Sequence, residues 1–152
     1  DEQNGGFSKA RTSRLRRPVT EGRFGPLAVN VATQRRDPDS LLSWMERLIR
    51  RRKETPELGW GHWKVLETNV TGVLSHRCDW EGRSVLAVHN LGDQPCVVRV
   101  QLGDVPEDGR LDDLLDERGA IGEIENSSLD LKMEGYGFRW FRITTPDQHT
   151  AL

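Results

Sequence analysis

At 152 residues, with 35% hydrophobic and 30% charged residues, the chain can form one ordinary domain, or a small domain plus a piece of another, around a small core. The net charge of −2 is uneven: residues 1–58 carry 13 Lys and Arg against 8 Asp and Glu, and residues 59–152 carry 9 against 16. No apolar run approaches the length of a membrane span, and the first residues lack the apolar core of a signal peptide, so we expect a cytoplasmic protein without membrane contact. Because the chain starts at Asp1 rather than Met, we also expect it to be a fragment.

The first 36 residues show almost no apolar periodicity and contain a basic run from Lys9 to Arg17. This run lacks the interleaved aromatic residues of a nucleic-acid surface, so a solvated loop is favoured over a nucleic-acid partner. A structureless segment of this length is unusual in a compact domain and is commonly functional, disordered or supported by another body.

Residues 37–58 contain the one clear amphipathic helix. Asp37 is a good N-cap, Pro38 suits the first helical position, and Thr55-Pro56 predicts the end of the helix. Its apolar residues recur at three- and four-residue spacing and form one wide stripe: Leu41, Leu42, Trp44, Met45, Leu48 and Ile49. One such helix cannot bury its stripe alone, so it needs a partner surface.

After a glycine-flanked aromatic turn at residues 59–63, the apolar period changes from 3.6 to 2. Glu81-Gly82-Arg83 predicts a hairpin turn between two strands. About seven short strands predict a mainly β fold, an antiparallel β-sandwich, with the expected strand segments at residues 73–80, 84–91, 96–102, 110–115, 129–133 and 138–143 among them. The last strand is apolar on both faces, which indicates that its outer face also needs a partner.

Candidate chemistry in these strands is sparse. Cys78 and Cys96 stand in no metal-type spacing and are interpreted as buried, reduced thiols. His76 and His89 have no further ligand at metal spacing, so we expect no metal and no cofactor. The acidic pairs Asp112-Asp113 and Asp116-Glu117 are interpreted as a solvated face. Four tryptophans are interpreted as core or interface residues, with sugar stacking as the alternative: Trp60, Trp63, Trp80 and Trp140.

Several motifs, in order, resemble one family. Asn4-Gly5-Gly6-Phe7-Ser8 resembles the Asn-Ala-Gly-Phe-Ser/Thr loop of the α-amylase superfamily, glycoside hydrolase family thirteen, although Gly5 replaces the usual Ala and Gln3 the usual Arg. Residues 29–42 resemble its Val-Asn-Val-x-x-Gln-x-x-Asp-Pro-x-Ser-Leu-Leu segment. Residues 53–61 and 135–141 are similar to trehalose-synthase-type members, and His62-Trp63 belongs only to a subset.

The resemblance implies that residues 1–58 are the tail of a catalytic (β/α)8 barrel, that residues 59–145 are its C-terminal β-sandwich domain, and that residues 146–152 are a disordered tail. The family's catalytic carboxylates lie at barrel strand ends that this chain lacks, so no catalytic residue is expected here. The resemblance places only Asn4 and Phe7 near the sugar site.

Two functions from different classes remain open. The first is a structural C-terminal fragment of a retaining enzyme acting on an α-glucoside, by hydrolysis or by isomerisation, with the rest of the barrel as its partner. The second is a free-standing carbohydrate-binding module. The unpartnered helix stripe and last strand favour the first, and they also predict self-association of the chain on its own.

Overall fold

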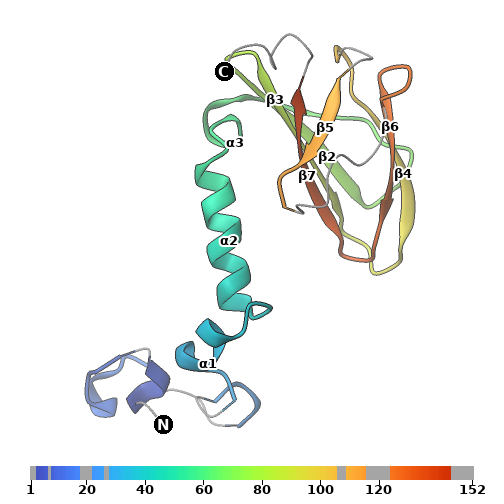
Figure 1. Ribbon diagram of the computed structural model, residues 1–152. Coiled ribbons are helices and arrows are strands. Elements are labelled where there is room, and N and C mark those ends of the chain that lie inside the picture. The colour runs from blue at the N-terminus through green and yellow to red at the C-terminus, as the bar shows by residue number, and fades with distance from the viewer. Residues whose placement is uncertain are drawn as a thin grey trace. The chain divides into compact units, whose positions relative to one another are not determined.

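The computed structural model describes residues 3–6, 8–17, 22–25, 28–105, 109–115 and 124–144. The chain divides into two compact units, an N-terminal unit, Asp1–Arg50, and a C-terminal unit, Arg51–Leu152, which are described separately (Figure 1). The predicted contact residue Phe7, the acidic pair Asp116-Glu117 and the predicted tail at residues 146–152 lie outside the described residues.

The N-terminal unit contains short helical turns and the start of the main helix. The 3-10 turns are η1 (Gln3–Gly6), η2 (Thr12–Arg14) and η3 (Gly22–Phe24), and the helices are α1 (Val31–Arg36) and α2 (Leu41–Lys53). The expectation of an irregular segment up to residue 36 is therefore wrong for α1. The sequence signal for α1 is a single capping residue: the Asn30 side chain accepts a hydrogen bond from the Thr33 N–H at 2.8 Å and caps the helix.

Helix α2 begins three residues later than the sequence predicts. Asp37 is not its N-cap, because its carboxylate accepts the Asp39 N–H at 2.9 Å and forms a separate turn before the helix. The Ser40 hydroxyl instead accepts the Ser43 N–H at 3.2 Å, which is the capping bond. The predicted end is confirmed: α2 stops at Lys53, and the Thr55 hydroxyl donates to the Arg51 carbonyl at 2.6 Å.

The predicted apolar stripe lies along α2, but no residue of this helix is buried. Leu41 is 69% exposed, and Met45 and Ile49 are also exposed. The stripe therefore lacks a complete cover in the part of the chain that the structure describes.

The C-terminal unit is an antiparallel β-sandwich preceded by a short helix, α3 (Glu57–Trp60). One sheet has five strands in the order β1-β2-β3-β7-β5, and the second pairs β4 with β6. The strands are β1 (His62–Val65), β2 (Val73–Trp80), β3 (Arg83–Asn90), β4 (Cys96–Gln101), β5 (Arg110–Asp113), β6 (Ser128–Met133) and β7 (Phe138–Thr144). The predicted mainly β fold is confirmed.

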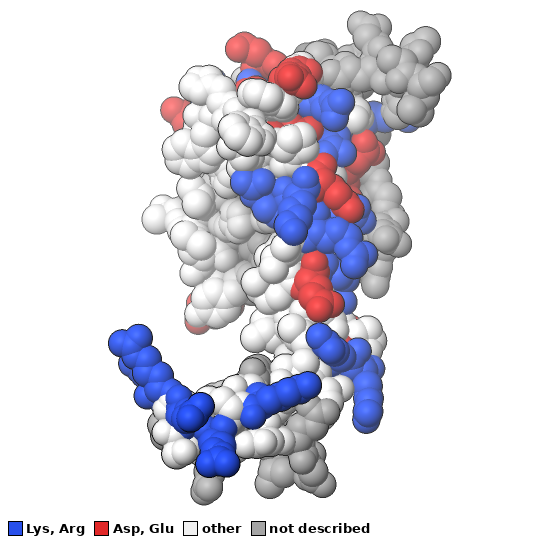
Figure 2. Space-filling model, turned by 90° about the vertical axis from the view of Figure 1, so that its left-hand side faces the viewer, with Lys and Arg blue, Asp and Glu red and all other residues white. Residues whose placement is uncertain are grey.

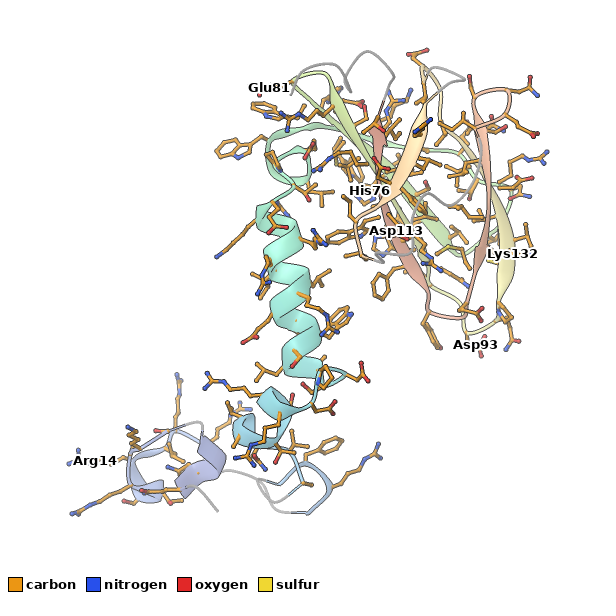
Figure 3. All side chains as sticks on the ribbon, viewed as in Figure 1. Arg14, His76, Glu81, Asp93, Asp113 and Lys132 are labelled. Carbon is orange, nitrogen blue, oxygen red and sulfur yellow. The ribbon has the colours of Figure 1, made fainter. Side chains whose placement is uncertain are left out.

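The β2–β3 hairpin has the turn that the sequence predicts. Glu81 and Gly82 connect the two strands with φ of 47° and 75°, the left-handed pair of a two-residue hairpin turn. The turn lies at one end of the sandwich, and Asp93, between β3 and β4, lies at the other (Figure 3). By contrast, the predicted aromatic turn at residues 59–63 is wrong, because its first part is the end of α3 and its last part is β1, paired with β2.

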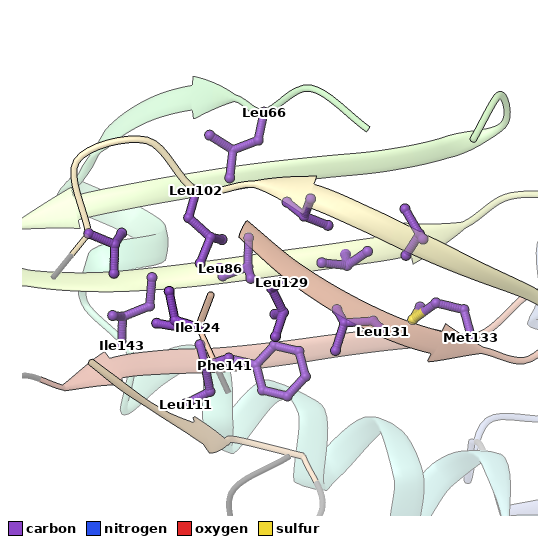
Figure 4. Close-up of a cluster of buried hydrophobic side chains, with 14 residues drawn as sticks. Leu66, Leu86, Leu102, Leu111, Ile124, Leu129, Leu131, Met133, Phe141 and Ile143 are labelled. Atoms are coloured by element: carbon purple, nitrogen blue, oxygen red, sulfur yellow. The ribbon is translucent and has the colours of Figure 1, made fainter. Parts of the chain in front are cut away.

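The core lies between the two sheets (Figure 4). It holds fourteen buried apolar side chains, drawn from both sheets and the loops between them. The largest is Phe141 of β7, which is fully buried; Leu86 of β3 lies beside it in the same sheet, and Leu131 of β6 comes from the other sheet. Each such side chain stabilises the fold by about 1.5–3 kcal/mol. None of the helices in the described ranges is long and apolar enough to cross a membrane.

Candidate functional site

The five-stranded sheet has one face in the core and a second, outer face. Strand alternation places Leu86, Val88 and Phe141 in the core, so their sequence neighbours face outward. We call six of the residues that the register places on this outer face, from four adjacent strands, the outer-face cluster: Trp63, Val65, Leu74, His76, His89 and Phe138. In Figure 3, His76 and Lys132 of β6 lie on opposite sides of the sandwich.

Aromatic and imidazole rings cross this face in a continuous row. The Trp63 ring centroid lies 5.6 Å from that of His76, and His76 stacks on His89 at 6.1 Å with an interplanar angle of 1°. His89 in turn stacks on Phe138 at 6.5 Å. The row therefore joins β1, β2, β3 and β7 on one surface.

Much of the outer-face cluster is exposed. Trp63 is 55% and Val65 is 53% exposed, and Leu74 and Phe138 are also classed as exposed. Figure 2 shows a wide area of uncharged side chains on the sandwich beside a band of mixed charge. Because contiguous apolar patches on proteins usually mark interaction sites, this face is a candidate docking surface.

The two histidines in the cluster are partly buried and are neutral at neutral pH. Burial lowers the pKa of His76 below its ordinary value of 6.5, and the neighbouring His89 lowers it further. Burial also lowers the pKa of His89. The His76 Nδ1 atom is buried without a hydrogen-bond partner in the structure.

Helix α3 covers part of the same sheet, where it packs against β2 and β3. Its Glu57 is fully buried, and the carboxylate lies 3.4 Å from the Arg142 guanidinium of β7. Trp60 follows on α3 with its ring centroid 6.5 Å from that of Trp80, yet it is 74% exposed. Trp60 and Trp63 are therefore not core residues. Of the predicted core or interface position, the core position is wrong for both tryptophans.

A second group of polar residues lies on the β4–β6 sheet. On the β4–β6 sheet an open pocket of about 360 Å³ is lined by Arg99, Glu125, Asn126, Ser128 and Asp130. Arg99 donates to Asp130 at 2.7 Å, and this hydrogen bond lowers the pKa of the Asp130 carboxyl, so that carboxyl is not a proton donor at neutral pH.

Of the two residues that the resemblance places near the sugar site, the structure describes Asn4. Asn4 is in η1 with a φ of 53°, and its amide donates to the carbonyls of Ser8 and Ala10 at 2.8 and 2.7 Å, so it shapes its own loop. The solvated-face interpretation is wrong for Asp113, whose side chain is buried beside Arg139 at 3.3 Å.

The cysteines are both free. Cys78 is buried as predicted, while Cys96 is half-buried. Burial raises the pKa of the Cys78 thiol, which keeps it protonated and unreactive. In the described ranges, no three His, Cys, Asp or Glu side chains are grouped closely enough to hold a metal ion.

Known proteins match this chain in sequence and in fold. Residues 82–142 match the family described as sucrose hydrolase-like, C-terminal domain. The chain is 32% identical to a trehalose synthase of Pimelobacter sp. (strain R48), over 96% of this chain and 26% of that protein. A trehalose synthase/amylase of Mycobacterium tuberculosis is 29% identical, over 95% of this chain and 24% of that protein. The chain is therefore similar in sequence to the C-terminal part of trehalose synthases.

A solved structure of similar fold is the isomaltulose synthase of Klebsiella sp. LX3, with a TM-score of 0.59 and 17% identity, over 78% of this chain and 20% of that one. At this identity the structural likeness shows the fold alone. The chain spans about a quarter of the length of the curated trehalose synthases it matches. The predicted α-amylase-superfamily resemblance is confirmed, while the barrel-tail assignment of residues 1–58 stays a prediction.

Proposed function

We propose that this chain is the C-terminal part of an α-glucoside-acting enzyme of the trehalose synthase type, with a structural rather than a catalytic role. The main observation in support of this proposal is that almost the whole chain aligns with the C-terminal quarter of trehalose synthases. Residues 1–58 would then be the tail of the catalytic (β/α)8 barrel, and residues 59–145 the sandwich that supports it.

The apolar surfaces support a barrel partner. The α2 stripe and the outer-face cluster are both exposed, and each presents large side chains of the kind that interfaces bury. The relatives are about four times longer than this chain, which leaves ample protein to cover both surfaces. We propose that the preceding part of the parent enzyme is the occupant.

The catalytic carboxylates of a retaining glycosidase would come from that preceding part, together with most contacts to the α-glucoside. Asn4 and Phe7 are proposed to lie at the edge of the sugar site, on the resemblance of their loop. The hydrogen bonds of Asn4 within its loop support a role in shaping it. We further propose a cytoplasmic location, in keeping with the free thiols of Cys78 and Cys96, and no cofactor.

A chimera tests this function. The aligned C-terminal segment of the Pimelobacter trehalose synthase is replaced by this chain, and trehalose formation is compared with that of an enzyme truncated before the segment. We expect the chimera to be active and the truncated enzyme to lose at least about tenfold in activity, because the barrel's last elements would be misplaced. A truncated enzyme as active as the chimera would contradict the supporting role.

Matched valines locate the docking surface within the chimera. Val65 of the outer-face cluster is 53% exposed, and Val97 of β4 is 58% exposed on the other sheet. We expect Val65→Asp to reduce the activity and thermal stability of the chimera and Val97→Asp to leave both nearly unchanged. Equal effects would argue against the outer face as the barrel contact.

A carbohydrate-binding module is the second candidate, favoured by the exposure of Trp60 beside Trp80. Exposed indole faces can stack on sugar rings. The test is a titration of the chain with maltodextrins, followed by tryptophan fluorescence. Saturation in the low-millimolar range, about 4 kcal/mol, that is lost in Trp60→Ala would favour the module. We expect no saturation.

A further inference from the structure

The pair His76–His89 is the unusual feature of the outer-face cluster. The two imidazoles come from neighbouring strands, β2 and β3, and lie parallel at 6.1 Å. Trp63 of β1 contacts the pair on one side and Phe138 of β7 contacts it on the other. Two titratable groups thus occupy the centre of an otherwise apolar surface.

Charged groups on the described part of this face interact with partners of their own. From β7 and α3 come Arg142 and Glu57, which pair with each other at 3.4 Å. From β5 comes Asp112, which accepts a hydrogen bond from the Thr144 hydroxyl at 3.3 Å. Of the described groups, only His89 acts electrostatically on the pKa of His76, and burial alone shifts that of His89.

We propose that the His76–His89 pair makes docking of this sandwich onto the barrel dependent on pH, with tight docking when both imidazoles are neutral and release when they are protonated. The inference rests on the proposed barrel partner and adds a regulatory property to that interface. Docking would bury the remaining exposed part of the cluster, and burial disfavours a charged imidazole. Two adjacent imidazolium ions would also repel each other.

The direction and size of the effect follow from linkage. The docked state binds fewer protons than the free state below the ordinary histidine pKa of 6.5, so docking weakens as the pH falls. Each proton that must be released weakens docking by up to about tenfold per pH unit. We therefore expect the dissociation constant to rise severalfold from about pH 8 to about pH 5.5, as the pH falls through the lowered pKa values of the two histidines in the free chain.

The experiment measures docking as a two-chain association. The whole 152-residue chain is labelled and titrated with the Pimelobacter trehalose synthase truncated before its aligned segment, at about pH 8 and at about pH 5.5. The test variant is His76→Gln/His89→Gln, which keeps polar side chains but cannot be protonated. The control is His62→Gln, because His62 of β1 is exposed and points to the other face of the sheet.

The outcomes separate this inference from the proposed function. We expect the unmodified chain and His62→Gln to bind the truncated enzyme more weakly at the lower pH. The double variant should bind it equally well at both pH values. If the unmodified chain bound equally well at the two pH values, the inference would be overturned, but the proposed docking surface would not be. Absence of association at the higher pH, or association that Val65→Asp does not weaken, would overturn the docking surface itself and the inference with it.

The imidazole signals of the labelled chain give a second readout by NMR. In the complex the pKa values of His76 and His89 should fall below those in the free chain. Unchanged titration of both histidines on docking would overturn the inference, even if affinity varies with pH for another reason.

Discussion

Glu57 occupies an unusual position for a carboxylate, since it is fully buried and, among the described residues, forms an ion pair with Arg142. Arg142 approaches it at 3.4 Å, but neither carboxylate oxygen has a hydrogen bond in the structure. Buried ion pairs add little to stability when intact, and removing one partner is costly because the other charge stays uncompensated. Glu57 therefore acts mainly to fix α3 on the sheet.

Glu57→Gln should lower the free energy of unfolding by about 1–3 kcal/mol, below the cost for a fully buried pair because the Arg142 side chain is 29% exposed. Urea unfolding of the chain measures it. Glu54→Gln is the control, since the Glu54–Arg51 pair is exposed on both sides and should contribute less than about 1 kcal/mol. Equal effects of the two variants would contradict the structural role of Glu57.

Gly135 is a second single-residue constraint, because the chain after β6 passes close to the turn after β3. A Cβ at Gly135 would lie 2.1 Å from the Asp93 carbonyl oxygen, a backbone atom that cannot move freely. Gly135→Ala should therefore cost about 1–3 kcal/mol of unfolding free energy. Gly92→Ala is the matched control, because the nearest atom to its Cβ is a side-chain oxygen at 3.4 Å. A neutral Gly135→Ala would show that the two loops are not in contact.

At the scale of elements, α2 carries the full predicted apolar stripe, but several side chains of that stripe are exposed. Leu48 lies in the middle of this stripe and is half-buried, while Glu46 is exposed on the polar side. We predict that the isolated chain self-associates through the stripe, that Leu48→Glu abolishes this, and that Glu46→Gln does not. Sedimentation velocity over a range of concentrations measures the association. A chain that stays monomeric at high concentration would contradict the prediction.

The elements that the sequence predicts well are those with a long periodic pattern. The β2–β3 hairpin combines eight alternating residues in β2 with a continuous apolar run in β3 and a two-residue turn with Gly82, and α2 shows its stripe over three turns. The four-residue elements α3 and β1 have too few residues for a period, and their structure depends on pairing with β2. The start of α2 was misplaced because Asp37 and Ser40 both suit an N-cap, and only the Asp37–Asp39 hydrogen bond decides between them.

The candidate docking surface was only partly predictable from the sequence, because part of it depends on how the strands pair. Alternation in β7 correctly separated Phe138 from Phe141 and indicated that the outer face needs a partner. The ring row could not be predicted, because the approach of His76 to His89 depends on the register between β2 and β3. Glu57 was also missed, since a single acidic residue near a helix end carries no sign that it will be buried.

At the scale of the whole molecule, several acids of the described residues are held in ways that suit structural roles. A retaining mechanism requires two carboxylates about 5–5.5 Å apart, one of them able to donate a proton. Three acids in the described part of the C-terminal unit are instead paired with arginines: Asp79 with Arg77, Asp113 with Arg139 and Asp130 with Arg99. Such pairing suits a scaffold, because an arginine neighbour stabilises the ionised carboxylate.

The isolated chain should therefore neither hydrolyse nor isomerise maltose, trehalose or isomaltose. Incubation with each sugar, followed by chromatographic product analysis, measures this, and the active chimera serves as the positive control. If turnover copurified with the chain, it could come from a contaminating enzyme or from the chain itself, and mutation distinguishes the two. A contaminating enzyme would be unaffected by Asp113→Asn or Asp130→Asn, whereas catalysis by this chain would be lost in one of them. Only the second result would show that the sandwich carries chemistry of its own, and that the barrel is not its sole source of activity.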